Sequence, residues 1–210
     1  VEGDDIVLTG RKAVVINAEA ADYLIVSARE SGAAADEEGI SLFLVPRDSA
    51  GLSLRGYALL AGGRAAEVDI DGLRLSADAR LGAGGSAYGA LKRASNRAEV
   101  ALAAETLGAM EAATELTREY LLTRQQFGRP IGTFQALQHR MATLLIELEQ
   151  ARSAVINAAG DLDPSAAEQA LQTSAASKRL GRAGRLVAGE RIQRHGSIAI
   201  TDEYEVAAER

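Results

Sequence analysis

The sequence predicts an α+β protein in which an antiparallel β domain at residues 1–83 is followed by an antiparallel bundle of long helices at 84–210. Short β-branched runs between Gly, Asn and Asp clusters fill the first part, and Ala and Leu recur at helical spacing in the second. No helical pattern of about 10–15 residues separates the strands, although parallel strands would need such crossovers. We therefore expect an antiparallel sheet, incomplete at its start.

Short strands are expected throughout the β domain. Thr9-Gly10 is predicted to be a turn after the first of them, and the most apolar strand, 40–45 (ISLFLV), ends before Pro46. Acidic residues alternate with apolar ones across 67–71, which predicts that one face of that strand is solvated. The expected strands cover 6–8, 12–17, 22–28, 40–45, 52–54, 67–70 and 73–75.

A glycine-rich stretch at 82–87 (GAGGSA) joins the two parts. Gly82, Gly84 and Ala87 match the G-x-G-x-x-A pattern of dinucleotide-binding loops. Such a loop follows an apolar strand within a βαβ unit, whereas SADAR precedes this stretch and no second strand follows it. We therefore interpret the stretch as a flexible linker between the sheet and the helices.

Three long helices are predicted after the linker, at 87–123, at 133–159, and from a Ser165–Glu168 capping box to about Arg194. Apolar residues at helical spacing on the first two helices are typical of surfaces that face a core. These residues are Val100, Ala103, Leu107, Met110, Thr117 and Leu121 on the first helix, and Leu137, Met141, Leu144, Leu148, Ala151 and Val155 on the second.

One face of the third helix is basic, because Lys178, Arg182 and Arg185 recur there at helical spacing. A solvated surface and an anion site are both consistent with this pattern. Helices of this length with short connections pack side by side, as in an antiparallel bundle.

The composition of the chain argues against nucleic-acid binding, metal binding and a membrane-spanning segment. A net charge of −6 makes the chain a poor non-specific nucleic-acid binder, because such binding rests on phosphate neutralisation. The chain has no cysteine and two histidines, His139 and His195, and its acidic run at 36–38 resembles a solvated hairpin tip, so no metal site is expected. No apolar run approaches the roughly 20 residues of a membrane span and no signal peptide opens the chain, so we expect a cytoplasmic protein.

Two glycine-containing bends carry the polar residues best suited to an anionic ligand. The first, 124–132, places Arg124, Gln126 and Phe127 at a break between the first two helices, and the second, 193–201 (QRHGSIAIT), follows the third helix. Arginine binds phosphate through two parallel hydrogen bonds, and glycine, which has no side chain, lets a ligand approach the backbone. Each bend alone is also typical of a structural turn, but together they suit a long ligand with a pyrophosphate.

The motifs at these bends resemble those of the flavin-dependent acyl-CoA dehydrogenases. R-x-x-F-G-x-P-I at 124–131 and Q-x-H-G at 193–196 carry the resemblance, and the segments 8–29, 39–46 and 64–75 are similar to the middle β domain of that family. The pattern looks closest to the branch with paired large and small subunits, such as pimeloyl-CoA dehydrogenase small subunits. On this resemblance, an N-terminal helical domain, the first β strands and a C-terminal helix are expected outside the sequence.

The resemblance implies FAD bound where a β domain meets a four-helix bundle, across a subunit interface. Arg124 would contact the FAD pyrophosphate, Phe127 would pack on the cofactor, and Gln135 would hydrogen-bond to it. Gln193 and the backbone of Gly196 would meet the adenosine–phosphate part of the FAD of a neighbouring subunit. The implied cofactor-binding residues are Arg124, Gln126, Phe127, Gln135, Gln193, Gly196 and Ser197.

The chemistry that the resemblance implies is α,β-desaturation of an acyl-CoA thioester in fatty acid or steroid catabolism. A glutamate removes the α-proton while the β-hydrogen leaves as hydride to flavin N5, and an electron-transfer flavoprotein then takes the electrons. The implied assembly is a homo- or heterotetramer built as a dimer of dimers.

Several residues depart from the family pattern. Ser197 and Ala199 replace two glycines of H-G-G-I-G, and Val14 and Ile16 stand where a tryptophan and a threonine often lie beside the flavin. The family's base falls either at or near Ala98, which cannot accept a proton, or beyond Arg210. Glu99 is adjacent, but one residue turns about 100° around a helix, so the catalytic base is left unassigned.

Three functions follow from these observations. The first is a subunit of an FAD-dependent acyl-CoA dehydrogenase, supported by the paired motifs. The second is a non-catalytic structural subunit that completes a partner's FAD site, supported by Ala98, Ser197 and Ile16. The third is a helical-bundle interaction module without a cofactor.

Overall fold

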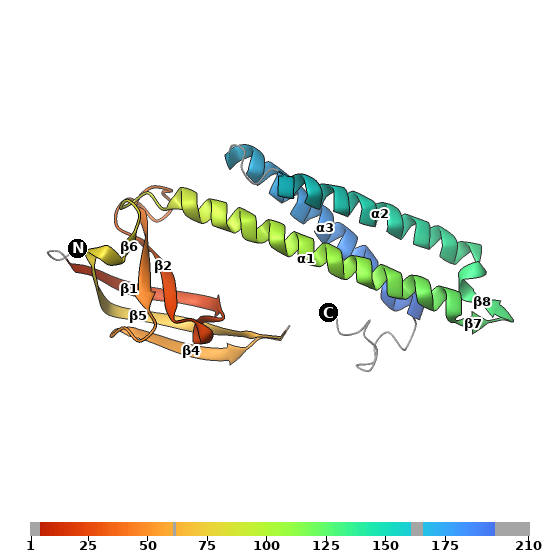
Figure 1. Ribbon diagram of the computed structural model, residues 1–210, viewed down its shortest axis with the longest axis horizontal. Coiled ribbons are helices and arrows are strands. Elements are labelled where there is room, and N and C mark those ends of the chain that lie inside the picture. Colours follow the sequence, from red (N-terminus) through yellow and green to blue (C-terminus); the bar gives the residue numbers. More distant parts are fainter. Residues whose placement is uncertain (1–4, 61, 161–165, 196–210) are drawn as a thin grey trace. The chain divides into compact units, whose positions relative to one another are not determined.

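The computed structural model describes residues 5–60, 62–160 and 166–195 (Figure 1). Contacts divide the chain into two compact units, Val1–Lys92 and Arg93–Arg210, and each is described by itself. The division falls within the first turns of α1 (Tyr88–Thr123), so this helix belongs to both units. The predicted domain boundary between residues 83 and 84 stays a prediction.

The first unit consists of two small antiparallel sheets, which confirms the predicted fold class. One sheet has the order β1-β5-β4 and the other β2-β3-β6. Alternating apolar residues turn inward from all of these strands except β6, since successive side chains of a strand point to opposite faces. The strands are β1 (Asp5–Ile16), β2 (Tyr23–Arg29), β3 (Ile40–Pro46), β4 (Leu52–Ala58), β5 (Arg64–Ser76) and β6 (Arg80–Leu81).

The predicted turn at Thr9-Gly10 is wrong, because β1 continues through it. Leu8 pairs with Leu73 of β5 and Gly10 pairs with Ile70, so the chain absorbs the glycine as an irregularity within the ladder. The strands expected at 67–70 and 73–75 likewise merge into β5. Cross-strand pairing over a dozen residues outweighs a local turn signal in both places.

The core of this unit lies between the inward faces of the strands. Phe43 and Val45 of β3 have no exposed surface, and Leu73 of β5 has 1%. The expected alternation across 67–71 is confirmed, since Val68 and Ile70 are buried, whereas the acidic residues that alternate with them are half-buried (Glu67 and Asp69) or exposed (Asp71).

The glycine-rich stretch connects β6 to α1, as the linker interpretation predicts, but hydrogen bonds hold it against the sheet. The Gly85 N–H donates to Oγ of buried Ser41 at 2.7 Å, and the Gly39 N–H donates to the Gly85 carbonyl at 2.8 Å. Ser41 Oγ in turn donates to Glu30 Oε2 at 2.8 Å. The start of α1 is therefore tied to β3.

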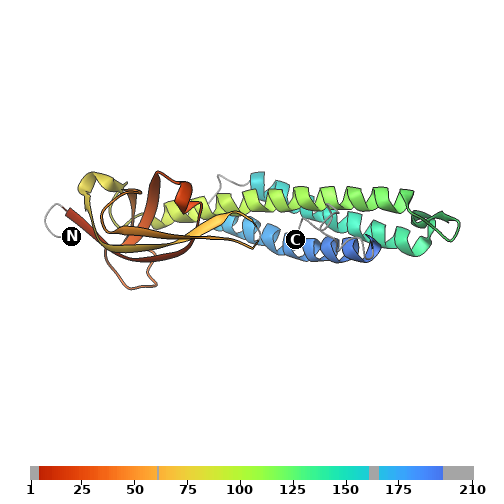
Figure 2. The same cartoon turned by 90° about the horizontal axis from the view of Figure 1, so that it is seen from below.

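The second unit is a bundle of α1, α2 (Gln135–Gly160) and α3 (Ala166–His195), which run side by side in Figures 1 and 2. All six expected core residues of α1 are buried. On α2, Leu144, Leu148, Ala151 and Val155 are buried, whereas Leu137 and Met141 are only half-buried. Ser165 of the predicted capping box lies outside the described residues.

Alanines set how closely the helices approach one another. Ala151 and Ala158 of α2 and Ala183 of α3 have no exposed surface and share one apolar cluster with α1. Small side chains let neighbouring helix backbones come close, which leaves no room for larger ones.

Replacing Ala151 by Leu is expected to lower the free energy of unfolding by about 1–3 kcal/mol, because the added atoms overfill a packed seam. Urea unfolding followed by helical circular dichroism measures this. Ala142→Leu, at an exposed position of the same helix, is the control and should change stability by less than about 0.5 kcal/mol. Equal effects of the two substitutions would contradict tight packing at Ala151.

Candidate functional site

The connection between α1 and α2 is a small β hairpin, a structure that the sequence pattern did not indicate. Its strands are β7 (Gln125–Gln126) and β8 (Arg129–Pro130), joined by Phe127 and Gly128. The α1 helix ends at Thr123, as the sequence predicts, and the hairpin occupies the break that follows. The Ile131 N–H donates to the Arg124 carbonyl at 2.9 Å and closes the hairpin base.

The tip of this hairpin holds an aromatic residue in an unfavourable backbone conformation. Phe127 has φ 58° and Gly128 has φ 79°, the pair of positive angles that a two-residue hairpin turn requires. A bulky residue is rarely found there, because its Cβ crowds the backbone. The Phe127 side chain is 90% exposed, so no core packing offsets this strain.

The side chains around the hairpin are exposed and available to a ligand. Arg124, Gln126 and Gln135 are all exposed, and Arg124 forms no ion pair within the described part of the chain. Phe127 meets Phe134 edge-to-face with ring centroids 6.1 Å apart, and Arg129 lies 4.2 Å above the Phe134 ring. A guanidinium, two amides and an aromatic face at one bend suit a ligand with anionic groups and a flat ring.

The α2 helix begins later than the sequence predicts. A short 3-10 turn at Ile131–Thr133 precedes it, Phe134 is extended, and the first helical residue is Gln135 rather than Thr133. Gln138 Nε2 donates to the Gly132 carbonyl at 3.0 Å, which fixes this turn against the helix start.

The end of α3 lies at the same end of the bundle as the hairpin (Figure 1). His195 stacks on Tyr120 of α1 with ring centroids 4.5 Å apart, and Arg194 Nη1 lies 3.1 Å from Met141 Sδ of α2. Gln193 is exposed in the last turn of α3. Gly196, Ser197 and Ala199 lie outside the described residues.

A buried charge cluster joins α3 to α2 beside Gln193. The Arg194 side chain has no exposed surface, and its Nη2 lies 3.0 Å from Glu190 Oε2. Arg140 of α2 approaches the same carboxylate at 2.9 Å. Sequence reasoning missed this cluster. The i, i+4 spacing of Glu190 and Arg194 was a usable signal, whereas Arg140 comes from another helix.

Burial and pairing oppose each other in this cluster. Burial lowers the pKa of Arg194, and the Glu190 carboxylate only partly offsets that effect. Burial also disfavours the charged form of Glu190, but its hydrogen bond to Arg140 and the charges of Arg140 and Arg194 outweigh it and lower the pKa of Glu190. The cluster thus depends on an ionised Glu190.

In the β unit, the two residues that depart from the family pattern are exposed. Val14 is 54% and Ile16 66% exposed, and Val14 has φ 54° at a register shift of β1. The Val14 N–H donates to Glu67 Oε1 at 3.4 Å, and the Tyr57 hydroxyl donates to the same oxygen at 3.0 Å. Burial, followed by this hydrogen bond to Glu67, raises the pKa of Tyr57.

The position expected for a base on α1 holds no proton acceptor. Ala98 and Glu99 are both exposed, and Glu99 lines a groove of about 350 Å³ with Gly181 and Gly184 of α3. Within residues 5–60, 62–160 and 166–195, no group of three or more His, Asp or Glu side chains is close enough to hold a metal ion. Of the helices described here, none is both long enough and apolar enough to span a bilayer.

Comparisons with known proteins give the family context. The sequence matches the family "Acyl-CoA dehydrogenase, C-terminal domain" over residues 87–209 and "Acyl-CoA dehydrogenase, middle domain" over residues 1–70. It is 46% identical to acyl-CoA dehydrogenase IpdE2 of Mycobacterium tuberculosis over 111 residues, which cover 52% of this chain and 32% of that protein.

Two further relatives extend over the whole chain. Acyl-CoA dehydrogenase FadE12 of Mycobacterium tuberculosis is 32% identical over 215 residues, covering 99% of this chain and 54% of that protein. The ChsE4-ChsE5 complex from the same organism superposes with a TM-score of 0.82 at 26% identity, covering 100% of this chain and 54% of that one. The chain therefore spans about half the length of these two relatives.

The charge cluster makes stability depend on pH in a defined direction. Because the pKa of Glu190 in the folded state lies below its ordinary value of 4.5, ionised Glu190 stabilises the fold above about pH 4.5. That stabilisation is lost as pH falls through the lower, folded-state pKa. Urea unfolding of the wild type between pH 3 and pH 7 should show it, and Glu190→Gln should flatten the profile.

At neutral pH, Glu190→Gln should cost about 2–3 kcal/mol, because it leaves the buried Arg194 guanidinium without its counter-charge. Glu115→Gln removes an exposed carboxylate paired with Arg118 and should cost less than about 0.5 kcal/mol. If the two substitutions cost the same, the Glu190 cluster is not an anchor of α3.

Proposed function

Because the chain belongs to the acyl-CoA dehydrogenase family, we propose that it is a subunit of an FAD-dependent enzyme that desaturates an acyl-CoA thioester between its α and β carbons. One observation carries the proposal. Arg124, Phe127, Gln135 and Gln193 lie at a single end of the bundle with exposed side chains, although nearly 70 residues separate the first from the last.

Each of these residues has a physical role in the proposed site. Arg124 pairs with the FAD pyrophosphate, since a guanidinium that has no ion-pair partner among the described residues gives a strong charge-assisted hydrogen bond to phosphate. Phe127 packs on the cofactor, because its strained backbone presents an apolar ring to the outside. Gln126, Gln135 and Gln193 can each donate and accept hydrogen bonds at the cofactor's polar edges.

The proposed site also includes Gly196 and Ser197, beyond the end of α3. The Arg194–Glu190 pair lies next to Gln193 in the last turn of α3, and the two residues follow that turn in the sequence. Bound FAD would supply the hydride acceptor of the reaction. The protein's contribution at this end of the bundle is to bind and orient the cofactor.

The substrate and partners of the proposed enzyme follow from the same family membership. An acyl-CoA thioester is the substrate, an electron-transfer flavoprotein takes the electrons, and the assembly is a homo- or heterotetramer. The ChsE4-ChsE5 structure is a complex of two proteins, and its similarity to this chain supports a partner subunit.

A second function is favoured by a specific observation. Ala98 and the exposed apolar Ile16 offer no acid, base or hydroxyl where the family pattern would place such groups. A non-catalytic subunit that completes a partner's FAD site accounts for this. Dye reduction driven by acyl-CoA with the chain alone supports a catalytic subunit, whereas reduction only with a partner subunit present supports the structural one.

Arg124→Ala is expected to reduce the flavin that co-purifies with the chain by about tenfold or more, because the pyrophosphate charge loses its partner. Flavin absorbance per mole of protein measures this. Arg118→Ala removes an exposed arginine from α1 and should leave flavin content unchanged. Wild-type flavin content in the Arg124 variant, or no flavin in any preparation, would contradict the proposed role.

A further inference from the structure

The bend at 124–132 contains two arginines whose surroundings differ. Arg124 is exposed and forms no ion pair within the described part of the chain. Arg129, in strand β8 of the hairpin, has the central carbon of its guanidinium 4.2 Å from the centre of the Phe134 ring. Arg124 is thus free to meet a ligand, whereas Arg129 already has a defined place within the bend.

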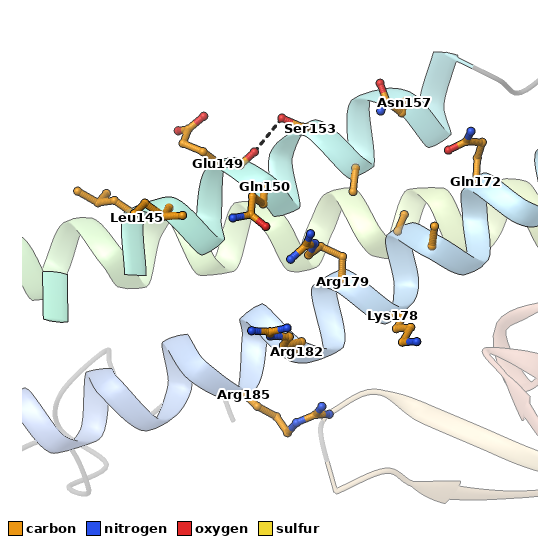
Figure 3. Close-up of a pocket in the computed structure, with 14 residues that line it drawn as sticks. Leu145, Glu149, Gln150, Ser153, Asn157, Gln172, Lys178, Arg179, Arg182 and Arg185 are labelled. Atoms are coloured by element: carbon orange, nitrogen blue, oxygen red, sulfur yellow. Dashed lines mark hydrogen bonds between the residues drawn. The ribbon is translucent and has the colours of Figure 1, made fainter. Parts of the chain in front are cut away.

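Arg129 differs from the arginines of the bundle that carboxylates hold. Figure 3 shows Arg179 and Arg182 in the groove between α2 and α3, and both approach Glu147, at 3.7 Å and 3.5 Å. Arg129 has no acidic partner among the residues that the structure describes. The face of the Phe134 ring, which carries partial negative charge, attracts its guanidinium instead. Arg129 therefore takes its position from this ring.

The Phe134 ring belongs to a segment that backbone hydrogen bonds fix. The Phe134 N–H donates to the Ile131 carbonyl at 3.1 Å, and the Phe134 carbonyl accepts from the N–H groups of Leu137 at 3.0 Å and Gln138 at 3.2 Å. These bonds join the 3-10 turn to the first turn of α2, and the Phe134 side chain is half-buried. Phe134 is thus the rigid base of the bend.

Phe127 has no comparable anchor at the hairpin tip. Its side chain is 90% exposed, and its backbone has φ 58°. An edge-to-face contact with Phe134 orients its ring, with ring centroids 6.1 Å apart and planes at 88°. Aromatic pairs prefer this arrangement, because the positive edge of one ring meets the negative face of the other. The three side chains therefore form one stack, in which Phe134 contacts both Arg129 and Phe127.

We propose that Arg129 and Phe134 are positioning residues of the FAD site, which hold the Phe127 ring in place before the cofactor binds. The inference rests on the proposed function. Arg129 braces Phe134, and Phe134 orients Phe127, which is the ring that packs on the cofactor. A ring that is already ordered loses less conformational freedom when a ligand packs on it, so the stack strengthens cofactor binding without adding a contact.

The order of residue 127 can be measured in the flavin-free full chain, which contains no tryptophan. Phe127→Trp keeps an aromatic ring at the hairpin tip, and time-resolved fluorescence anisotropy separates the local motion of this single indole from tumbling of the chain. Arg129→Ala or Phe134→Leu, added to it, should raise the amplitude of the local motion about twofold. Arg124→Ala removes the other arginine of the bend and should leave the local motion unchanged.

FAD binding is measured by titrating the flavin-free full chain, with native Phe127, and following flavin fluorescence. Arg129→Ala and Phe134→Leu should each raise the Kd about two- to fivefold, the size expected for one exposed cation–π or edge-to-face contact. The double variant should bind no more weakly than the weaker single variant, because both substitutions remove the same support. Phe134→Tyr keeps the ring and should bind like the wild type.

Three results would overturn the proposal. The first is local motion at residue 127 that neither Arg129→Ala nor Phe134→Leu changes. The second is unchanged FAD affinity in both variants while Arg124→Ala weakens binding, which leaves the proposed function standing and removes the positioning role. The third is weaker binding for Arg129→Ala with wild-type binding for Phe134→Leu, which would assign Arg129 to a direct contact with a cofactor phosphate.

Failure of the proposed function has a different signature. The wild type and every variant would then bind no FAD, and the cofactor role of the stack would be contradicted with it. The anisotropy measurement needs no flavin, so it would still decide whether Arg129 and Phe134 hold residue 127 in place.

Discussion

The buried pair of Arg194 and Glu190 is the interaction on which the arrangement of the bundle end depends. A guanidinium without exposed surface is tolerated only when a carboxylate and further polar contacts compensate for the water that it has lost. Glu190 provides that compensation from one turn earlier on α3, and Arg140 ties the same carboxylate to α2. Together with the stacking of His195 on Tyr120, this holds the last turn of α3 against both other helices.

This constraint explains how distant segments come to share one surface. The hairpin at 125–130 leaves the end of α1, Gln135 opens α2, and Gln193 lies in the last turn of α3. Each segment alone is a turn or a helix end with exposed polar groups. Only the packing of the three helices places an arginine, amides and an aromatic ring at one end. The proposed cofactor site is therefore a property of the assembled bundle.

Among the residues that the structure describes, two combine an exposed apolar side chain with a left-handed backbone. Phe127 lies at the hairpin tip and Val14 at a register shift of β1, and neither gains stability from burial. Strain of this kind persists where the surroundings impose it, and it is concentrated at functional sites. Phe127 belongs to the proposed cofactor site, so the strain at the hairpin tip and the proposed function refer to the same position.

The sequence by itself determined the features that depend on local periodicity. It predicted the antiparallel β part, the three long helices and the buried stripe of α1, with the α1 bounds within one residue, because the repeats of strands and helices are visible over short windows. Its motifs also indicated the family that the chain resembles.

Tertiary structure decided the features that depend on residues distant in the chain. Pairing with β5 carried β1 through Thr9-Gly10, pairing of Gln126 with Arg129 made the break between the first two helices a hairpin, and packing of α2 against α3 brought Arg140 to the Glu190 carboxylate. The sequence alone thus shows the polar residues of the bend at 124–132, but they share a surface with Gln193 only because three helices pack as one unit.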